Sequence, residues 1–228
     1  MRAIIVSNGV IRHPEQDRTW LQPRDLRVAA DGGLQHCLTW GLRPDLLIGD
    51  LDSVADQDLS VLQSQGVEIQ RHPARKDETD LELALREIQR RGARPGRPGQ
   101  WPRGRWDQSL ANSLLLANPD FRDLALRLVD GPQELLCIHG GQVATIRGRP
   151  GDTVSLIPLA GNADGVHTQG LEYRLAGEAL EFAATRGVSN VLLEEHAQIR
   201  LQAGRLLCAI IHQTHEPNPT TEKGGTDR

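Results

Sequence analysis

The segment RPDLLIGDLDSV, residues 43–54, places two carboxylates, Asp50 and Asp52, directly after the apolar run Leu46 to Ile48. A continuous apolar run that ends in polar residues is typical of a strand buried on both faces, as in a parallel sheet. Side chains alternate along a strand, so two acids two positions apart would share one face and repel. Either the pair belongs to an ordinary turn, since turns favour Asp and Ser, or a divalent cation such as Mg²⁺ neutralises it.

Three more runs of this kind surround it, and helical patterns separate them. The predicted strands are AIIVSN (3–8), LRVAADGG (26–33), LLIGD (46–50) and VEIQRHP (67–73). Helices are predicted between them, ending at Gly41 and at Gly66. The strongest helical pattern is TDLELALREIQRRG (79–92), where Thr79 and Glu82 match a capping box and Gly92 provides the stop. This alternation predicts an α/β fold with a Rossmann-like parallel sheet, whose ligands gather at the carboxyl ends of the strands.

The pattern changes after residue 132. Short apolar runs separated by glycine-containing turns follow, with little helical periodicity: ELLCIHG (134–140), QVATIRG (142–148), DTVSLIPLAG (152–161), LEYRLAG (171–177) and RLLCAIIH (205–212). We therefore expect an α/β catalytic, nucleotide-binding domain over 1–132 and a smaller all-β domain, a sandwich or barrel, over 133–214. The polar tail 215–228 is expected to be disordered.

One segment does not fit this alternation. RRGARPGRPGQWPRGRW (90–106) consists largely of Arg, Gly and Pro, at a place where another apolar strand is expected. Three interpretations remain open: a basic loop that closes over phosphates, a linker without function, or a local reading-frame error in the gene.

Composition narrows the class of protein. The 228 residues carry a formal net charge of -4, which gives no overall basic field for nucleic acid or an anionic membrane. The three cysteines are widely spaced and form no CxxC motif, so neither a disulfide framework nor a zinc site is indicated. No stretch has the length of a signal peptide's apolar core or of a membrane span, which predicts a cytoplasmic protein.

Acidic residues follow several of the predicted strands. Asp31 ends the second, Asp50 and Asp52 end the third, and Asp80 lies in the first turn of the capped helix just after Lys76. Each has an ordinary alternative: a tight turn for Asp31, and the helix dipole for Asp80. Together they can converge on one crevice with glycine amides and a lysine, which suits metal-assisted phosphoryl or pyrophosphoryl transfer.

The sequence as a whole resembles the thiamine pyrophosphokinase (thiamine diphosphokinase) family. The resemblance depends on the order and spacing of five motifs: ADGG (30–33), PDLLIGDLDS (44–53), KDETDLELAL (76–85), GRWDQSLAN (104–112) and GVSN (187–190). It implies an α/β catalytic domain followed by a β-sandwich domain, in a homodimer whose active sites lie between the subunits. It also implies transfer of a pyrophosphoryl group from ATP to the hydroxyl of thiamine with Mg²⁺, giving thiamine diphosphate and AMP.

The resemblance assigns roles residue by residue. Asp50, Asp52 and Asp80 would bind the metal and carry the catalysis, and Ser189 and Asn190 would contact thiamine. The residues implied for ATP binding are Asp31, Gly32, Gly33, Ser53, Lys76, Asp77, Thr79, Arg105, Asp107 and Asn112.

The sequence departs from the family pattern in two places: the motif around Gly104, and the Arg-, Gly- and Pro-rich segment before it, which occupies the place of the family's strand and glycine turn. Arg103 precedes Gly104 where the family has a further glycine, and Gln108 stands where the family has a histidine, which alone could titrate near neutral pH. Two alternatives to the implied function follow. One is a pyrophosphokinase for another hydroxymethyl or hydroxyethyl acceptor, such as a pterin. The other is a relative that binds nucleotide or thiamine without catalysis.

Overall fold

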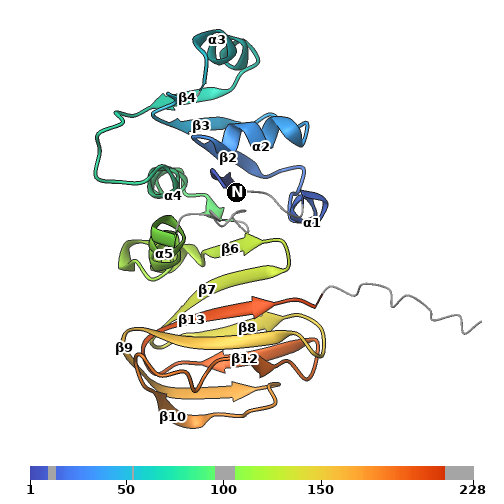
Figure 1. Cartoon of the computed structure of the whole chain (residues 1–228), viewed down its shortest axis with the longest axis vertical. Coiled ribbons are helices and arrows are strands. Elements are labelled where there is room, and N and C mark those ends of the chain that lie inside the picture. Colours follow the sequence, from blue (N-terminus) through green and yellow to red (C-terminus); the bar gives the residue numbers. More distant parts are fainter. Residues whose placement is uncertain (10–13, 53, 96–105, 214–228) are drawn as a thin grey trace, which may run out of the picture.

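The computed structural model describes residues 1–9, 14–52, 54–95 and 106–213. It contains two sheets, with the parallel sheet above the antiparallel one in the view of Figure 1. Most of the anomalous segment and the tail from residue 214 lie outside the described residues, as does Ser53. No helix of the described part is long and apolar enough to cross a membrane.

The first sheet has five parallel strands in the order β4-β3-β2-β1-β5. Its strands are β1 (Arg2–Val6), β2 (Leu26–Ala30), β3 (Leu46–Gly49), β4 (Glu68–Arg71) and β5 (Arg94–Pro95). The helices that connect them are α1 (Pro14–Arg18), α2 (Gly33–Thr39), α3 (Asp56–Ser64) and α4 (Asp80–Arg90). The four predicted strands and three predicted helices are thus confirmed. Of the segment 90–106, where a further strand is expected, the described residues include the strand β5, which pairs with β1 at the end of the strand order.

Both faces of this sheet are covered. Leu34 and Cys37 of α2 and Leu59 and Leu62 of α3 pack in one hydrophobic cluster with inward residues of β1, β2 and β3. The predicted stripe of α4 packs on the opposite face. The order of strands reverses beside β1: successive strands β2, β3 and β4 move away on one side, and β5 returns on the other. Such a reversal opens a crevice at the carboxyl ends of the strands.

The chain then passes through α5 (Trp106–Leu115) and the 3₁₀ helix η1 (Pro119–Leu124) into an antiparallel sheet of order β6-β7-β13-β9-β12-β8. Its strands are β6 (Arg127–Asp130), β7 (Gln133–His139), β8 (Val143–Arg147), β9 (Thr153–Gln169), β10 (Ala176–Leu180), β11 (Asn190–Val191), β12 (His196–Arg200) and β13 (Ala203–Ile211). β10 and β11 also pair with β9. Because β6 pairs with β7, this sheet begins before the expected domain boundary at residue 132.

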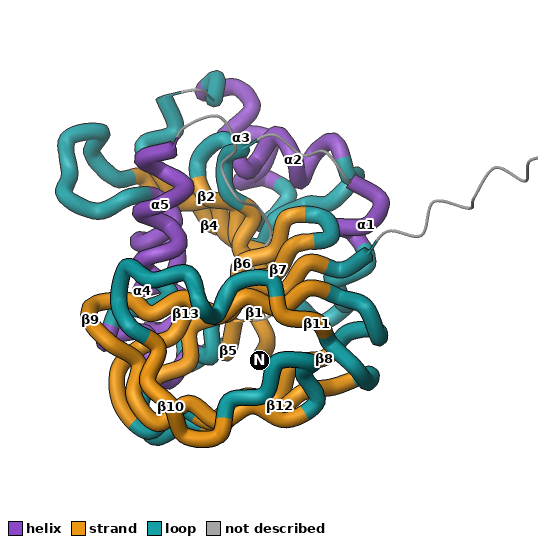
Figure 2. Tube along the Cα trace, turned by 60° about the horizontal axis from the view of Figure 1, so that its bottom comes forward, coloured by secondary structure: helices purple, strands orange, loops and turns teal. Residues whose placement is uncertain are grey.

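The long strand β9 joins the two halves of this β domain. Its first part pairs with β13, and its second part, after a register shift, pairs with β10 and β12. Figure 2 shows β10, β12 and β8 on one side of the domain and β13, β7 and β6 on the other. Alternate residues of β13, among them Leu206, Cys208 and Ile210, lie in the core between these halves, while Leu207 faces α4 and η1.

The apolar run 171–177 contributes to a strand only at its end. Leu171 makes only an isolated bridge to Leu192, and β10 begins at Ala176. Leu171 and Leu175 are both buried, which accounts for the apolar pattern, but they anchor a loop.

Candidate active site

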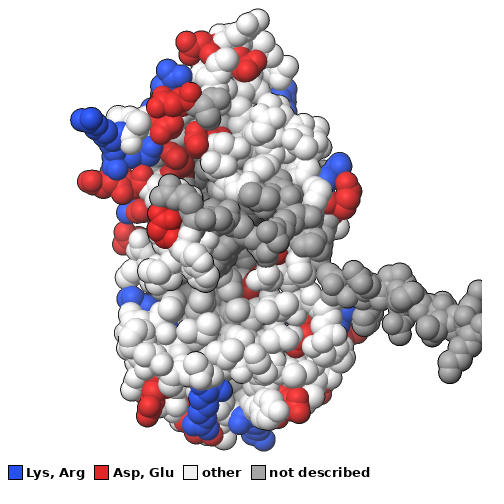
Figure 3. Space-filling view, in the orientation of Figure 1, with Lys and Arg blue, Asp and Glu red and all other residues white. Residues whose placement is uncertain are grey.

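A polar cavity of about 110 Å³ lies where the order of the parallel strands reverses. It is lined by the ends of β1 and β2, the first turn of α4 and one side of α5, through Ser7, Asn8, Ala30, Asp31, Thr79, Asp80, Leu81, Gln108 and Asn112. A larger hollow of about 510 Å³ adjoins it between α2 and α3 and shares Asn8 and Asp31 with it. Figure 3 shows acidic side chains, with basic ones among them, at the upper left of the molecule, the side on which the loop from β4 to α4 lies in Figure 1.

Asp31 is held at this edge by an unusual backbone. Its φ of 45° lies in the left-handed region, and its N–H donates to the carbonyl of Ile48 at 2.8 Å. Burial raises the pKa of Asp31, and the nearby carboxylates of Asp80 and Asp50 raise it further, while the Gly32 N–H and Lys76 oppose the shift. These couplings place Asp31, Asp50 and Asp80 in one electrostatic cluster, as the sequence predicts.

At each of the two glycines after Asp31, a side chain would meet a different neighbour. A Cβ on Gly33 would lie 1.9 Å from the carbonyl oxygen of Val6, because the first residue of α2 packs directly on the end of β1. A Cβ on Gly32 would lie 2.8 Å from the Asn8 side chain, which also lines the cavity. Gly33 is therefore required for close packing of helix and strand, one of the established uses of glycine after a first strand.

Asp50 and Asp52 do not share a face as they would on a regular strand. β3 ends at Gly49, and the buried Leu51 between the two acids has a φ of 61°. The backbone N–H of Asp52 donates to Asp50 Oδ1 at 3.1 Å. Asp50 faces the cluster, where its Oδ2 lies 4.0 Å from the Lys76 ammonium, whereas Asp52 is exposed.

Lys76 lies between two of the acids. Its Nζ is 3.0 Å from Asp80 Oδ1 and 4.0 Å from Asp50 Oδ2. Half of the predicted capping box is present: the Thr79 hydroxyl accepts from the Glu82 N–H at 3.2 Å, whereas the Glu82 carboxylate accepts from Arg86. The cap fixes the start of α4 and thereby the position of Asp80. Asp77, in the loop before the helix, is exposed.

The second nucleotide motif is described only in part. Arg105 lies outside the described residues, and Asp107 is exposed on α5. Asn112 is buried and lines the polar cavity, together with Gln108. Gln108 thus lies in the cavity at the position where the family pattern has a histidine.

Ser189 and Asn190 lie in the β domain, and neither is among the described residues that line the two hollows. Ser189 is exposed with a φ of 62°, and its N–H donates to Ser155 Oγ at 3.0 Å. The Asn190 side chain is buried and hydrogen-bonded to backbone: Oδ1 accepts from the N–H groups of Tyr173 and Val191, and Nδ2 donates to the Tyr173 carbonyl.

Comparison with protein families adds to this geometry. Residues 16–128 match the model described as thiamin pyrophosphokinase, catalytic domain, and residues 142–206 match thiamin pyrophosphokinase, vitamin B1 binding domain. The chain belongs to the thiamin pyrophosphokinase family. The two matches together span more than three quarters of its length, in the order in which the sequence motifs occur.

Individual relatives agree with this assignment. A thiamine pyrophosphokinase of Bacillus subtilis (strain 168) is 24% identical over 182 residues, which are 80% of this chain and 85% of the relative. A crystal structure of the Bacillus subtilis thiamine pyrophosphokinase has a TM-score of 0.81 at 21% identity, covering 94% of this chain and 100% of that one. The thiamin pyrophosphokinase from Candida albicans has a TM-score of 0.77 at 16% identity, covering 92% of this chain and 88% of that one. The structural likenesses establish the fold.

Within this family fold, the acidic cluster has the donor chemistry for a hard divalent cation. Asp31 Oδ1 and Asp80 Oδ1 are buried and accept no hydrogen bond from any group in the described ranges, although Lys76 lies close to the latter. The same ranges hold no group of three His, Cys, Asp or Glu side chains placed to hold an ion. Mg²⁺ commonly takes one or two protein carboxylates and completes its shell with water and phosphate oxygens. The carboxylates therefore fit a cation that enters together with phosphates.

Ser7 and Asn8 were not singled out from the sequence, yet both line the polar cavity. They directly follow β1, as Asp31 follows β2 and Asp50 follows β3. The rule that ligand-binding residues follow parallel strands would have identified them. Their uncharged side chains made them less conspicuous than the aspartates.

Proposed function

We propose that this protein transfers a pyrophosphoryl group from ATP to the hydroxyl of thiamine, giving thiamine diphosphate and AMP. The observation that supports it is the convergence of Asp31, Asp50, Asp80 and Lys76 at the reversal of strand order, in a chain that also matches a vitamin B1 binding domain. Positioning and charge neutralisation are the main requirements of such a transfer, and this cluster can provide both.

Asp50, Asp52 and Asp80 are the residues that would bind Mg²⁺, which when bound neutralises charge on the phosphates. Lys76 would contact phosphate oxygens. Asp31, Gly32 and Asn112, which line the two hollows, would line the nucleotide crevice, with Gly33 beside them. Ser53, Asp77, Thr79, Arg105 and Asp107 remain proposed nucleotide-binding residues on the basis of the family motifs.

The thiamine hydroxyl attacks the β-phosphorus as AMP leaves, so its proton needs an acceptor. Asp80 and Asp52 are both candidates from the sequence. Asp80 is favoured because it lines the cavity with an oxygen that accepts no hydrogen bond from the described residues, whereas Asp52 is exposed.

Ser189 and Asn190 are proposed as thiamine-binding residues with different tasks. Because the Asn190 amide is already hydrogen-bonded to Tyr173, it orders the segment around Tyr173, which exposes 65% of its surface. Ser189 is exposed beside it and can contact the substrate directly.

We also propose a homodimer with active sites between its subunits. The support is an exposed apolar face of α5, on which Trp106, Leu110 and Leu114 follow one another at intervals of four residues and are 88%, 59% and 47% exposed. We propose further that the first domain is Rossmann-like and that the second domain is a β-sandwich. We also propose a cytoplasmic location, which the free cysteines Cys37, Cys137 and Cys208 support.

The test is to incubate the purified full chain with ATP, Mg²⁺ and thiamine and to measure AMP and thiamine diphosphate, with light scattering of the same sample for its mass. Asp80→Asn is expected to lower turnover about 100-fold or more. Asp56→Asn is the matched control, since the Asp56 side chain is 93% exposed at the start of α3 and its loss should leave turnover unchanged. AMP formed only with a hydroxymethylpterin would favour that acceptor, and nucleotide binding without product would indicate a non-catalytic relative.

A further inference from the structure

Lysine is rare in this chain. Lysine and arginine together number 26, and only Lys76 and Lys223 are lysines. Lys223 lies outside the described residues, so the single described lysine is the one in the acidic crevice. An arginine there would form a planar, bidentate ion pair with a carboxylate. A lysine is a compact charge on a flexible stem, which can change partners more readily.

The ammonium group of Lys76 forms an ion pair with Asp80 and lies at a longer distance from Asp50. Asp80 Oδ1, at 3.0 Å, accepts no hydrogen bond within the described ranges, and Asp50 Oδ2 is at 4.0 Å. The Lys76 side chain is 12% exposed, less than the 26% of Asp50 and the 27% of Asp80. A lysine buried to this extent requires a negative partner, and the acids supply it.

The charges of the cluster are unbalanced. Asp31, Asp50 and Asp80 bring three carboxylates together, and Lys76 is the one cation that ion pairs with them among the described residues. One ammonium group leaves net negative charge that favours a divalent cation. That cation, however, would meet the same Asp50 and Asp80 oxygens that Lys76 now occupies, and two cations at that separation repel.

We propose that Lys76 is the built-in counterion of the acidic crevice before ligands bind, and that it leaves Asp50 and Asp80 for the phosphates of an arriving nucleotide, which frees both carboxylates for the metal ion. The proposal rests on the proposed function insofar as that function supplies the nucleotide. Lys76 is thus a positioning residue that sets the order of binding: the metal ion binds tightly only with, or after, the nucleotide.

This exchange couples the two ligands. Without a nucleotide, a divalent cation has to displace Lys76 from its acidic partners. Without a metal ion, a nucleotide still gains the ammonium group, because Lys76 exchanges one anionic partner for another. Removing the charge at position 76 should therefore strengthen binding of free metal and weaken binding of metal-free nucleotide, two effects of opposite sign that a general loss of structure would not produce.

The experiment measures Mn²⁺ binding to the full-length protein without nucleotide, by the decrease of the electron paramagnetic resonance signal of free Mn²⁺. Lys76→Met is expected to bind Mn²⁺ about tenfold more tightly than wild type, within the usual range of coupling between sites. In EDTA, the same variant should bind α,β-methylene-ATP more weakly than wild type. Equal or weaker Mn²⁺ binding by Lys76→Met would overturn the proposal.

Lys76→Arg separates charge from side-chain shape. It keeps the cation, so its Mn²⁺ affinity should be no higher than that of wild type, and Mn²⁺ binding as tight as in Lys76→Met would contradict the proposal. Melting temperatures of both variants exclude misfolding as the cause. Failure of the proposed function is seen separately, as absence of thiamine diphosphate from wild type, and would leave the Mn²⁺ comparison intact.

Discussion

Gly33 occupies a position where the backbone leaves no room for a side chain. A Cβ there would approach the Val6 carbonyl oxygen to 1.9 Å and its carbon to 2.6 Å, and neither atom belongs to a movable side chain. We expect Gly33→Ala to displace α2 from β1 and to lower the free energy of unfolding by about 2–3 kcal/mol, as for other overpacked sites. Urea denaturation at fixed protein concentration measures the free energy of unfolding. Turnover should also fall, because Asp31 lies two residues before Gly33 and would move with α2.

Gly41 provides the matched control at the other end of the same helix. It has a φ of 67°, and a Cβ there would meet nothing within 4 Å. Gly41→Ala therefore costs only the left-handed backbone, about 1–2 kcal/mol, and should leave turnover largely intact. If Gly33→Ala unfolds at the same urea concentration as wild type, the close packing of α2 on β1 is not rigid.

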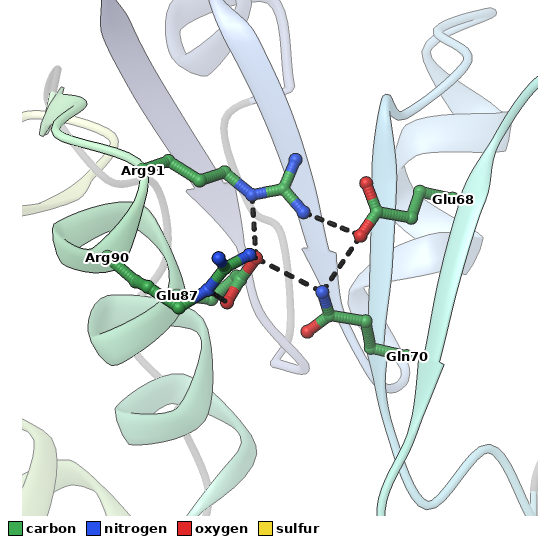
Figure 4. Close-up of polar contacts among 5 residues, drawn as sticks. All are labelled: Glu68, Gln70, Glu87, Arg90 and Arg91. Atoms are coloured by element: carbon green, nitrogen blue, oxygen red, sulfur yellow. Dashed lines mark hydrogen bonds and ion pairs between the residues drawn. The ribbon is translucent and has the colours of Figure 1, made fainter.

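The elements α4 and β4 are joined by a network of charged side chains, shown in Figure 4. The Glu87 carboxylate accepts hydrogen bonds from Arg90, Arg91 and Gln70, and Arg91 also binds Glu68 on β4. The hydrogen bond from Arg90, assisted by those from Arg91 and Gln70, lowers the pKa of Glu87 to about 2. The network holds the end of α4 against the edge strand β4.

Replacing Glu87 with Gln should lower the free energy of unfolding at pH 7 by about 1–2 kcal/mol, because Arg91 would lose its buried partner while Arg90 is largely solvated. The sign with pH follows from the lowered pKa. The carboxylate stabilises the folded state above its ordinary pKa of 4.5, and this contribution is lost as the pH falls from 4.5 towards 2. Unfolding of wild type and Glu87→Gln should therefore converge in acid.

The control for this variant lies on the same helix. Glu82 forms an exposed pair with Arg86 at an interval of four residues. Glu82→Gln is expected to cost only about 0.2–0.5 kcal/mol. A cost of Glu87→Gln no larger than this would show that the network of Figure 4 adds nothing beyond an ordinary surface pair.

Comparison of α4 with the segment 171–177 shows which elements can be predicted from local sequence. α4 carries a cap at Thr79, an apolar stripe and a stop at Gly92, three independent signals that agree. The segment 171–177 has only two buried anchors, Leu171 and Leu175, and a loop held by the Asn190 side chain satisfies that pattern equally well. The hydrogen bonds that decide between the two come from residues far along the chain.

At the scale of the whole molecule, the convergence of Asp31, Asp50 and Asp80 could be predicted because parallel topology brings consecutive strand ends to one edge. The position of Lys76 between Asp50 and Asp80 could not, since it depends on how the loop from β4 returns to α4. The pairing of β6 with β7 could not be predicted either, because the short apolar sequence of β6 would suit a strand of either sheet.

The two sheets share a hydrophobic core, so they should unfold together. Phe121 of η1 is 1% exposed and packs in a cluster that joins α4 and the parallel strands to Leu128 of β6 and Leu207 of β13. We expect Phe121→Ala to lower the free energy of unfolding by about 3–5 kcal/mol. Phe182, the other phenylalanine, is 56% exposed, and Phe182→Ala should cost far less.

The chain provides its own probes for this test. All four tryptophans precede residue 132, and the single tyrosine, Tyr173, lies in the β domain. Tryptophan fluorescence therefore reports on the first part of the chain, and ¹⁹F NMR of fluorotyrosine reports on the second. With one shared core, both signals should change at the same urea concentration in wild type, and Phe121→Ala should move both to lower urea. If Phe121→Ala shifts the fluorescence transition and leaves the ¹⁹F transition in place, the two sheets are stabilised independently and the shared core does not couple them.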